Sequence, residues 1–183
     1  MGKRTVLLLM CVALAGLLAV PAVVAAPAGK DIPANENSNG LYLYPKAYAE
    51  TPEWTTLWEA DAWGKYNFTL TGQEISGVFN GHGLVAGTDY TLISYNDPWG
   101  ASPQLVVIGS GVADEYGDVH IKAGPVDLGA DVASPIYDWS GAGDGYKIWL
   151  VLSADITGNS FNAWNPSAYL FENNRIGATA SAP

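Results

Sequence analysis

Three tryptophans stand where an aromatic ring could bind a ligand, each near amide or carboxylate side chains. Trp99, Trp139 and Trp164 all lie within two residues of an Asn or Asp, in segments typical of loops. An indole ring can pack against the C–H face of a sugar while neighbouring polar groups bind its hydroxyls. The same rings also suit the ends of a β-sandwich, where they would be core. Core packing is the favoured interpretation, and we predict that any ligand-binding surface of the domain involves these three residues.

The two histidines offer less for metal or general-base chemistry. Imidazole titrates near neutral pH and binds metals, and His82 stands between two glycines. His120, however, falls on the expected outer face of a strand, and a zinc site needs three or four ligands. No cysteine follows the N-terminal leader to complete such a set. We expect His82 to be a turn residue that hydrogen-bonds to the backbone.

The motifs of secreted hydrolases are absent or incomplete in the sequence. No Gly-x-Ser-x-Gly nucleophile elbow occurs, and the Gly-Ser-Gly segment 109–111 fits a bend within a strand. A glycosidase needs two carboxyl groups across a cleft. The acids Glu53, Glu59, Asp61 and Glu74 are candidates for that pair, but without further support. The sequence therefore predicts no catalytic residue, and a binding role is favoured over an enzymatic one.

Aspartates are abundant in the expected loops. Calcium takes six to eight oxygen ligands, but no Asp-x-Asn-x-Asp-Gly ligand loop is present. Aspartate is also a common turn former, because its carboxylate accepts hydrogen bonds from nearby backbone N–H groups. We expect turn formation and no cofactor, with bound calcium as the alternative. The residues concerned are Asp114, Asp118, Asp127, Asp131, Asp138, Asp144 and Asp155.

One N-glycosylation sequon occurs, the Asn-Phe-Thr segment that begins at Asn67. Tyr66, Phe68 and Leu70 alternate with polar residues, which predicts a strand with one buried face. Asn67 then lies on the outer face, where it is accessible as a glycosylation acceptor.

The N-terminal residues have the parts of a secretory signal peptide. Two basic residues precede an apolar run over residues 6–20, and small residues follow it. We assign residues 1–28 to a signal helix and 29–40 to a flexible leader, and we expect an extracellular or cell-surface protein. Cys11, the single cysteine, lies inside the run, so the exported chain would have no disulfide. The alternative is a retained anchor, since a spanning helix needs about 20 apolar residues.

The charge balance is strongly acidic. The chain has 8 Lys and Arg against 18 Asp and Glu, a formal net charge of −10, and loss of Lys3 and Arg4 with the leader makes it −12. Such a charge repels the phosphate backbone of nucleic acids and anionic membrane surfaces. We therefore expect a protein or glycan partner, with no nucleic acid and no membrane contact beyond the signal segment.

Short apolar stretches bounded by Gly, Pro, Asn or Asp predict an all-β domain over residues 41–176. About eight short strands in this length point to an antiparallel two-sheet β-sandwich around one apolar layer. Residues 177–183 are small and uncharged, which is typical of a disordered tail. The expected strands cover residues 41–44, 66–70, 75–79, 89–95, 105–112, 119–122, 146–152 and 168–171.

The sequence also predicts the position or the pairing of some of these strands within a sheet. Segments 89–95 and 146–152 are apolar on both faces and are expected at the centre of a sheet. The glycines of segment 105–112 predict a bulge or bend. Segment 119–122 is expected to pair with it as a hairpin across the acidic turn 114–118.

The segment after Pro52 is ambiguous. Pro52 suits the first position of a helix, and Trp54, Leu57 and Trp58 would then share one face. Threonine and tryptophan also favour strands, so a strand is nearly as well supported as a short helix and both stay open.

Five sequence blocks stand out together: residues 79–84, 90–93, 109–111, 147–153 and 164–172. They resemble a group of small secreted β-sandwich domains from methanogenic archaea and some bacteria. The resemblance covers residues 41–176, implies the fold and the extracellular setting, and supplies no catalytic residue.

These features lead us to expect a secreted or cell-surface interaction module that binds protein or glycan and catalyses no reaction. A secreted hydrolase with an unrecognised carboxylate site is the first alternative, and a structural envelope component is the second.

We predict that the exported protein begins at Ala26 or Gly29, because the small residues Ala25 and Ala28 end the leader. N-terminal sequencing of the exported protein measures this, and a thiol assay should find no cysteine. A chain that still begins at Met1 would instead support the retained anchor.

Overall fold

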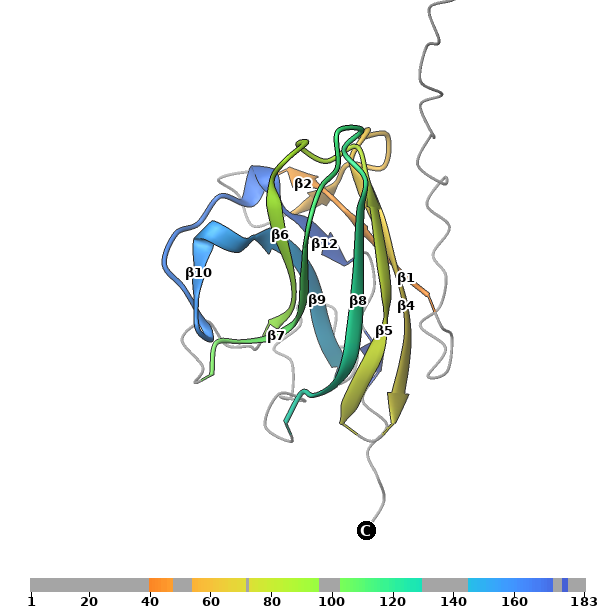
Figure 1. Cartoon of the computed structure of the whole chain (residues 1–183), viewed down its shortest axis with the longest axis vertical. Helices are drawn as coiled ribbons and strands as arrows, with labels where there is room; N and C mark the ends of the chain where they lie inside the picture. The colour runs from red at the N-terminus through yellow and green to blue at the C-terminus, as the bar shows by residue number, and fades with distance from the viewer. Residues whose placement is uncertain are drawn as a thin grey trace, which may run out of the picture.

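The computed structural model describes residues 40–47, 54–71, 73–95, 103–129, 145–172 and 176–177 (Figure 1). These residues form strands and two short 3-10 helices. The main strands are β1 (Leu41–Tyr44), β4 (Trp63–Thr71), β5 (Glu74–His82), β6 (Asp89–Tyr95), β7 (Leu105–Val112), β8 (Val119–Asp127), β9 (Gly145–Leu152) and β12 (Leu170–Glu172). The short elements are β2 (Lys46–Ala47), β3 (Thr55–Thr56), η2 (Ser153–Asp155), β10 (Ile156–Thr157), β11 (Ser160–Phe161), η3 (Pro166–Ala168) and β13 (Ile176–Gly177).

The main strands form one antiparallel sheet in the order β7-β6-β9-β12-β1-β4-β5-β8, with β13 also paired to β9. Strands β2 and β3, and strands β10 and β11, form two separate small ribbons. The all-β prediction is confirmed. Strands β6 and β9 each have neighbours on both sides, as expected for segments that are apolar on both faces.

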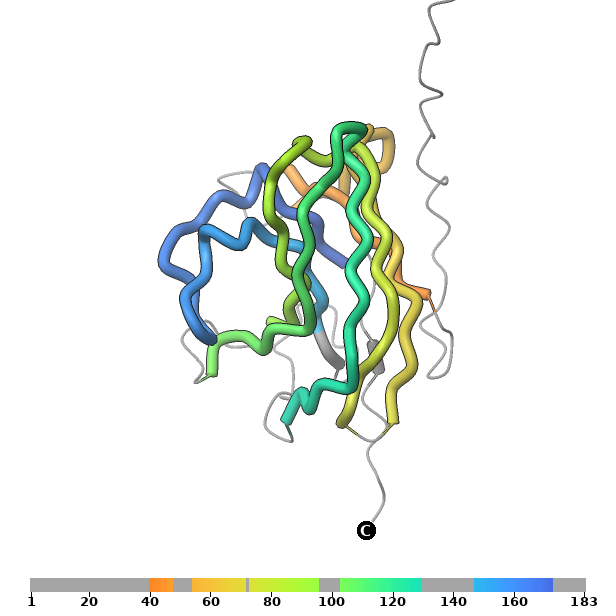
Figure 2. The backbone as a smooth tube through the Cα atoms, viewed as in Figure 1, coloured from red at the N-terminus to blue at the C-terminus, as the bar shows by residue number. Residues whose placement is uncertain are grey.

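The sheet curls around a core to which all eight main strands contribute (Figure 2). Tyr66, Phe79, Leu92, Ile121 and Leu150 point into this core and are fully buried. Burial of one such side chain contributes about 1.5–3 kcal/mol relative to leaving it in water. Because strand residues alternate between faces, a one-residue slip in any ladder would turn these side chains outward.

A second apolar layer covers the outer face of β6, β9 and β12. Ile93, Val151 and Phe171 lie on that face and are buried beneath the segment 153–169, which holds η2, β10, β11 and η3. Figure 1 shows this segment as the blue arch beside β6 and β9. The central strands are therefore buried on both faces.

The two edges of the curled sheet, β7 and β8, meet through side chains. A Cβ atom on Gly109 would lie 2.8 Å from Ile121 Cγ2, and one on Gly111 would lie 3.1 Å from Ile121 Cγ1. The missing side chains on β7 therefore leave room for Ile121 of β8. We name this contact of Gly109, Gly111 and Ile121 the glycine seam.

The predicted bulge is confirmed next to these glycines. Leu92 on β6 pairs with Gly109, whereas Ile93 pairs with Val107, so Ile108 is the extra residue on β7. A bulge bends its strand and increases the local twist, which helps the edge of the sheet turn toward β8.

The expected two-sheet sandwich is not confirmed, because the ladders join all the main strands into one sheet. The short strands β12 and β1 make this connection, since β12 pairs with both β9 and β1, and β1 also pairs with β4. The first strand of the domain thus closes the gap that would have separated two sheets.

The expected hairpin between β7 and β8 is wrong. Strand β8 pairs with β5, and β7 pairs with β6. The turn between them does form, because the Asp114 N–H donates to the Asp118 carbonyl at 2.8 Å. Beyond this turn the glycine seam replaces a ladder, and each strand pairs with its other neighbour.

The segment after Pro52 enters the described part of the chain as a strand. Thr55 and Thr56 form β3 and pair with Ala47 and Lys46 of β2. The predicted signal helix, the leader up to residue 39 and the tail after residue 177 lie outside the described residues. Within the described ranges, no helix has the length and hydropathy needed to cross a bilayer.

Replacing Gly109 by Val should lower the free energy of unfolding by about 1–3 kcal/mol, because the new side chain must displace Ile121. Urea denaturation measures the change. The matched control is Gly124→Ala, where a Cβ atom would meet nothing within 4 Å, and where we expect a change within about 0.5 kcal/mol. In a double-mutant cycle with Ile121→Val, the losses should be less than additive. Additive losses would contradict the seam contact.

Candidate functional site

Trp164 lies between β11 and η3, where its ring both packs and reaches the surface. Its ring centroid lies 6.2 Å from that of Trp54, 5.5 Å from that of Phe161 and 5.4 Å from that of Tyr169. All three contacts are edge-on, with interplanar angles of 77–84°. The residue is nevertheless 36% exposed. It is therefore partly packed and partly exposed, so both roles that the sequence left open stay open for this residue.

Trp149 of β9 lies beneath this surface ring. Its ring stacks on Tyr95 at 4.2 Å and 8°, and its centroid is 5.1 Å from Phe171 and 6.0 Å from Trp164. Trp149 and Phe171 are direct partners in the β9–β12 ladder, and direct partners lie on the same face of a sheet. The ladder register therefore assembles the rings on the outer face.

We name this group the aromatic patch. Trp54 and Trp164 are 39% and 36% exposed, whereas Tyr95, Tyr169 and Phe171 are buried. Aromatic pairs contribute about 0.5–1.5 kcal/mol beyond the area that they bury, so the two exposed rings rest on a firm base. The members are Trp54, Tyr95, Trp149, Phe161, Trp164, Tyr169 and Phe171.

Exposed apolar side chains continue along the segment after Trp54. Leu57 is 42% exposed and Trp58 is 38% exposed. Trp58 packs on the buried ring of Tyr44 with centroids 5.0 Å apart, and Tyr44 is the ladder partner of Phe171. The patch and Trp58 therefore lie along the same side of the sheet.

A buried polar network holds the loop that carries Trp164. The Asp155 carboxylate accepts two bonds from Asn165 Nδ2, at 2.9 and 3.0 Å, and one from the Tyr169 hydroxyl at 2.5 Å. The Asp155 carbonyl also accepts the Asn162 N–H at 2.9 Å. Burial, with the bond to Asp155, raises the pKa of Tyr169. Asp155 was a calcium candidate, and here it fixes the loop on both sides of Trp164.

Glu172 is the second buried carboxyl group beside the patch. Burial raises its pKa, while Lys46, a bond to the Glu172 backbone and Lys147 oppose that shift. The Trp149 indole does not reach hydrogen-bond geometry, and Glu172 Oε2 and Trp149 Nε1 both lack a hydrogen-bond partner within the described residues. Burying such polar atoms without partners is costly.

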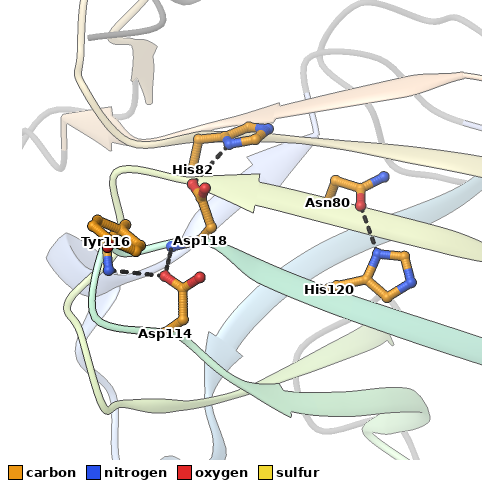
Figure 3. A network of polar contacts seen from close by, with 6 residues as sticks. All are labelled: Asn80, His82, Asp114, Tyr116, Asp118 and His120. Carbon is orange, nitrogen blue, oxygen red and sulfur yellow. Dashed lines mark hydrogen bonds and ion pairs between the residues drawn. The ribbon is translucent and has the colours of Figure 1, made fainter. Parts of the chain in front are cut away.

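His82 ends β5, and its side chain bonds to a carboxylate and not, as predicted, to the backbone. Its Nδ1 lies 2.8 Å from Asp118 Oδ1 (Figure 3), and its ring centroid lies 4.7 Å from that of Trp63. His120 lies on the exposed face of β8 as predicted, with its Nδ1 2.7 Å from Asn80 Oδ1. No group of three or more His, Cys, Asp or Glu among the described residues could hold a metal ion.

Two of the loop aspartates act as turn formers. Asp114 Oδ1 accepts the N–H groups of Tyr116 and Asp118, both at 2.9 Å, within the β7–β8 turn (Figure 3). Asp127 Oδ1 accepts the Gly129 N–H at 2.8 Å. For these two residues the prediction of turn chemistry is confirmed.

The remaining predicted positions fall into two groups. Asn67 is exposed on the outer face of β4, as the alternation predicted. Among the acidic candidates, Glu59, Asp61 and Glu74 are exposed. Residues outside the described ranges are Glu53, Trp99, Asp131, Asp138, Trp139 and Asp144.

Sequence reasoning missed two members of the site. Trp54 was seen as part of a helix or strand, and its partner Trp164 is far away in the chain, so no local pattern joins them. Glu172 ends an apolar strand, and an acid directly after Leu170 and Phe171 was the available signal of burial.

Comparison with known proteins adds no neighbour to this description: no family model, curated protein or solved structure matches the chain. The resemblance to secreted archaeal and bacterial domains stays a prediction.

Replacing Glu172 by Gln should stabilise the protein at pH 7.5 and by less at pH 4.5. The ordinary pKa is 4.5 and burial raises it, so the folded state holds its proton more tightly than the unfolded state does. Stability then falls as the pH rises from about 4.5 through the folded pKa, and the amide removes that fall. Urea denaturation at both pH values measures the effect.

The matched control is Glu74→Gln, at the exposed start of β5, which should follow the wild type. If Glu172→Gln destabilised the protein more at pH 7.5 than at pH 4.5, the charged carboxylate would instead be favourable where it lies.

Proposed function

We propose that this protein is a secreted or cell-surface interaction module that binds a glycan or a protein through the aromatic patch. The observation that carries the proposal is the pair Trp54 and Trp164, two rings in contact that are each more than a third exposed. Tryptophan is enriched among the residues that dominate binding energy. The secreted setting rests on the leader sequence.

The support beneath the pair favours recognition. A ring that is already fixed loses little conformational freedom when a ligand binds, and this improves affinity. Trp164 is held by neighbouring rings and by the Asp155 network on either side of it. Trp54 packs on the buried ring of Phe171 at 5.2 Å. Both rings therefore present a preorganised surface.

The buried carboxyl groups fit a supporting role better than catalysis. All the bonds to the Asp155 carboxylate come from its own loop and from Tyr169. Glu172 is 7% exposed and its Oε2 is buried. A general acid must reach the atom that it protonates, so neither carboxyl group is placed for turnover as it stands.

A secreted hydrolase is the second candidate, and Glu172 is the observation in its favour. Burial raises the pKa of this carboxyl, which is how general acids stay protonated near neutral pH. Incubation with a polysaccharide panel and an assay for new reducing ends tests it. Turnover that Glu172→Gln abolishes would establish the hydrolase.

Replacing Trp164 or Trp54 by Ala should weaken ligand binding by about 1–3 kcal/mol, as for an aromatic anchor. A glycan array finds the ligand, and calorimetry on the wild type and the two variants measures the loss. The control is Tyr116→Ala, an aromatic residue that is 75% exposed in the β7–β8 turn, where binding should be unchanged.

Thermal melts of the same variants separate binding from packing. If the patch is core alone, Trp164→Ala should lose about 3–5 kcal/mol of stability, as other large-to-small core changes do. An empty array, an absence of protein partners and collapsed melts would together remove the reason to regard the patch as a binding surface.

A further inference from the structure

A polar row crosses the outer face of four strands. Tyr42 on β1 pairs with Lys65 on β4. Lys65 in turn pairs with Asn80 on β5, and Asn80 pairs with His120 on β8. Direct ladder partners lie on one face, and Figure 3 shows Asn80 and His120 meeting on the same side of their strands. The row therefore presents a phenol, an ammonium, an amide and an imidazole in line.

A second row runs beside the first. Asn67 on β4 pairs with Val78 on β5, and Val78 pairs with Lys122 on β8. Asn67 and Lys122 are exposed. Lys65 and Lys122 lie on the two strands that flank β5, so neighbouring-strand spacing separates their strands by about 10 Å. The two lysines thus stand on opposite sides of β5, where Asn80 and Val78 lie between them.

Contacts within the rows orient these side chains. Lys65 Nζ lies 5.3 Å from the centroid of the Tyr42 ring, within the range of a cation–π interaction. The His120 ring is tied to Asn80 at 2.7 Å. Side chains that are already placed lose less entropy when a ligand binds.

The local charge is opposite to that of the whole chain. The formal net charge is −10, yet the two rows contain lysines and no acidic residue. The acids on these strands lie at the ends: Glu74 pairs with Asp127 at one end, and Asp118 lies beside His82 at the other. The middle of the face is therefore a cationic zone between two acidic margins.

We infer that this face binds an acidic polysaccharide whose sugar carboxylates contact Lys65 and Lys122. The ammonium groups would receive the carboxylates, and the amides of Asn67 and Asn80 would hydrogen-bond the hydroxyls between them. Charge-assisted hydrogen bonds of this kind are the strong ones. The acidic margins would then confine the bound part of the polysaccharide to the two central rows.

A sparsely charged sugar chain fits better than a nucleic acid. A nucleic acid carries a charge at every phosphate and gains affinity from many cationic contacts, whereas this face has two lysines within an acidic molecule. The face also offers amide donors and acceptors for which a sugar chain has hydroxyl partners. This inference concerns a different surface from the aromatic patch and does not depend on it.

The test compares polygalacturonate with its fully methyl-esterified form, which has the same sugar chain without the carboxylate charge. The full chain is produced in a host that does not N-glycosylate, so that Asn67 stays unmodified. Binding is measured by calorimetry at low and high salt. The variants are Lys65→Gln and Lys122→Gln, and the charge-matched control is Lys30→Gln, a lysine that precedes the β domain in the sequence.

We expect binding to polygalacturonate that weakens with added salt and no binding to the ester. Lys65→Gln and Lys122→Gln should each raise the Kd about tenfold, as the loss of a charged hydrogen bond does. Lys30→Gln should leave the Kd unchanged, and all variants should melt like the wild type.

Four results would overturn the inference. One is equal binding of the esterified chain, and another is an equal effect of Lys30→Gln. The third is an absence of binding to polygalacturonate, and the fourth is stronger binding to polyphosphate or poly-glutamate. If Trp164→Ala lost binding while Lys65→Gln and Lys122→Gln bound normally, the ligand would belong to the aromatic patch and not to this face.

Discussion

The central strands β6, β9 and β12 carry apolar side chains on both faces, and this is the constraint on which the rest of the structure depends. Leu92 and Leu150 point inward, while Ile93, Val151 and Phe171 point outward. A sheet buried on both faces needs a cover on each side. The curled sheet covers the inner face, and the segment 153–169 must cover the outer face.

That outer cover explains why the aromatic patch lies where it does. A short segment without an α-helix or a long strand cannot pair all of its own backbone polar groups, so they need other partners. Asp155 and Tyr169 supply them, and the loop between Asp155 and Asn165 is thereby fixed. Trp164 is carried by this loop and fills its outer edge against Trp54. Half-exposed rings are thus a by-product of covering the sheet, and they form the surface for which we propose recognition.

Much of the fold could be predicted because strand periodicity is local. The alternation around Tyr66 and the two-sided apolar character of β6 and β9 were visible in the sequence, and so was the bulge near Gly109. The partner of β8 could not be predicted, because a hairpin signal is local whereas the Gly109–Ile121 contact depends on how the whole sheet curls.

The site was less accessible to such reasoning. Trp164 was identified from its polar neighbours, which do hold its loop. Its contact with Trp54 joins two segments that lie near opposite ends of the domain's sequence. The burial of Glu172 depends on strands β1 and β9 packing on either side of β12. Contacts between segments that are distant in the sequence cannot be predicted from local sequence patterns.

The glycine seam has a consequence for how the fold responds to temperature. Ladders of hydrogen bonds join the other neighbouring main strands, but β7 and β8 meet through the side chain of Ile121 and the bare backbone of Gly109 and Gly111. Apolar contacts weaken on cooling because their driving force near room temperature is entropic. We therefore expect the closure of the sheet to be sensitive to cold, with its two edges loosening on chilling before the ladders that hold its centre.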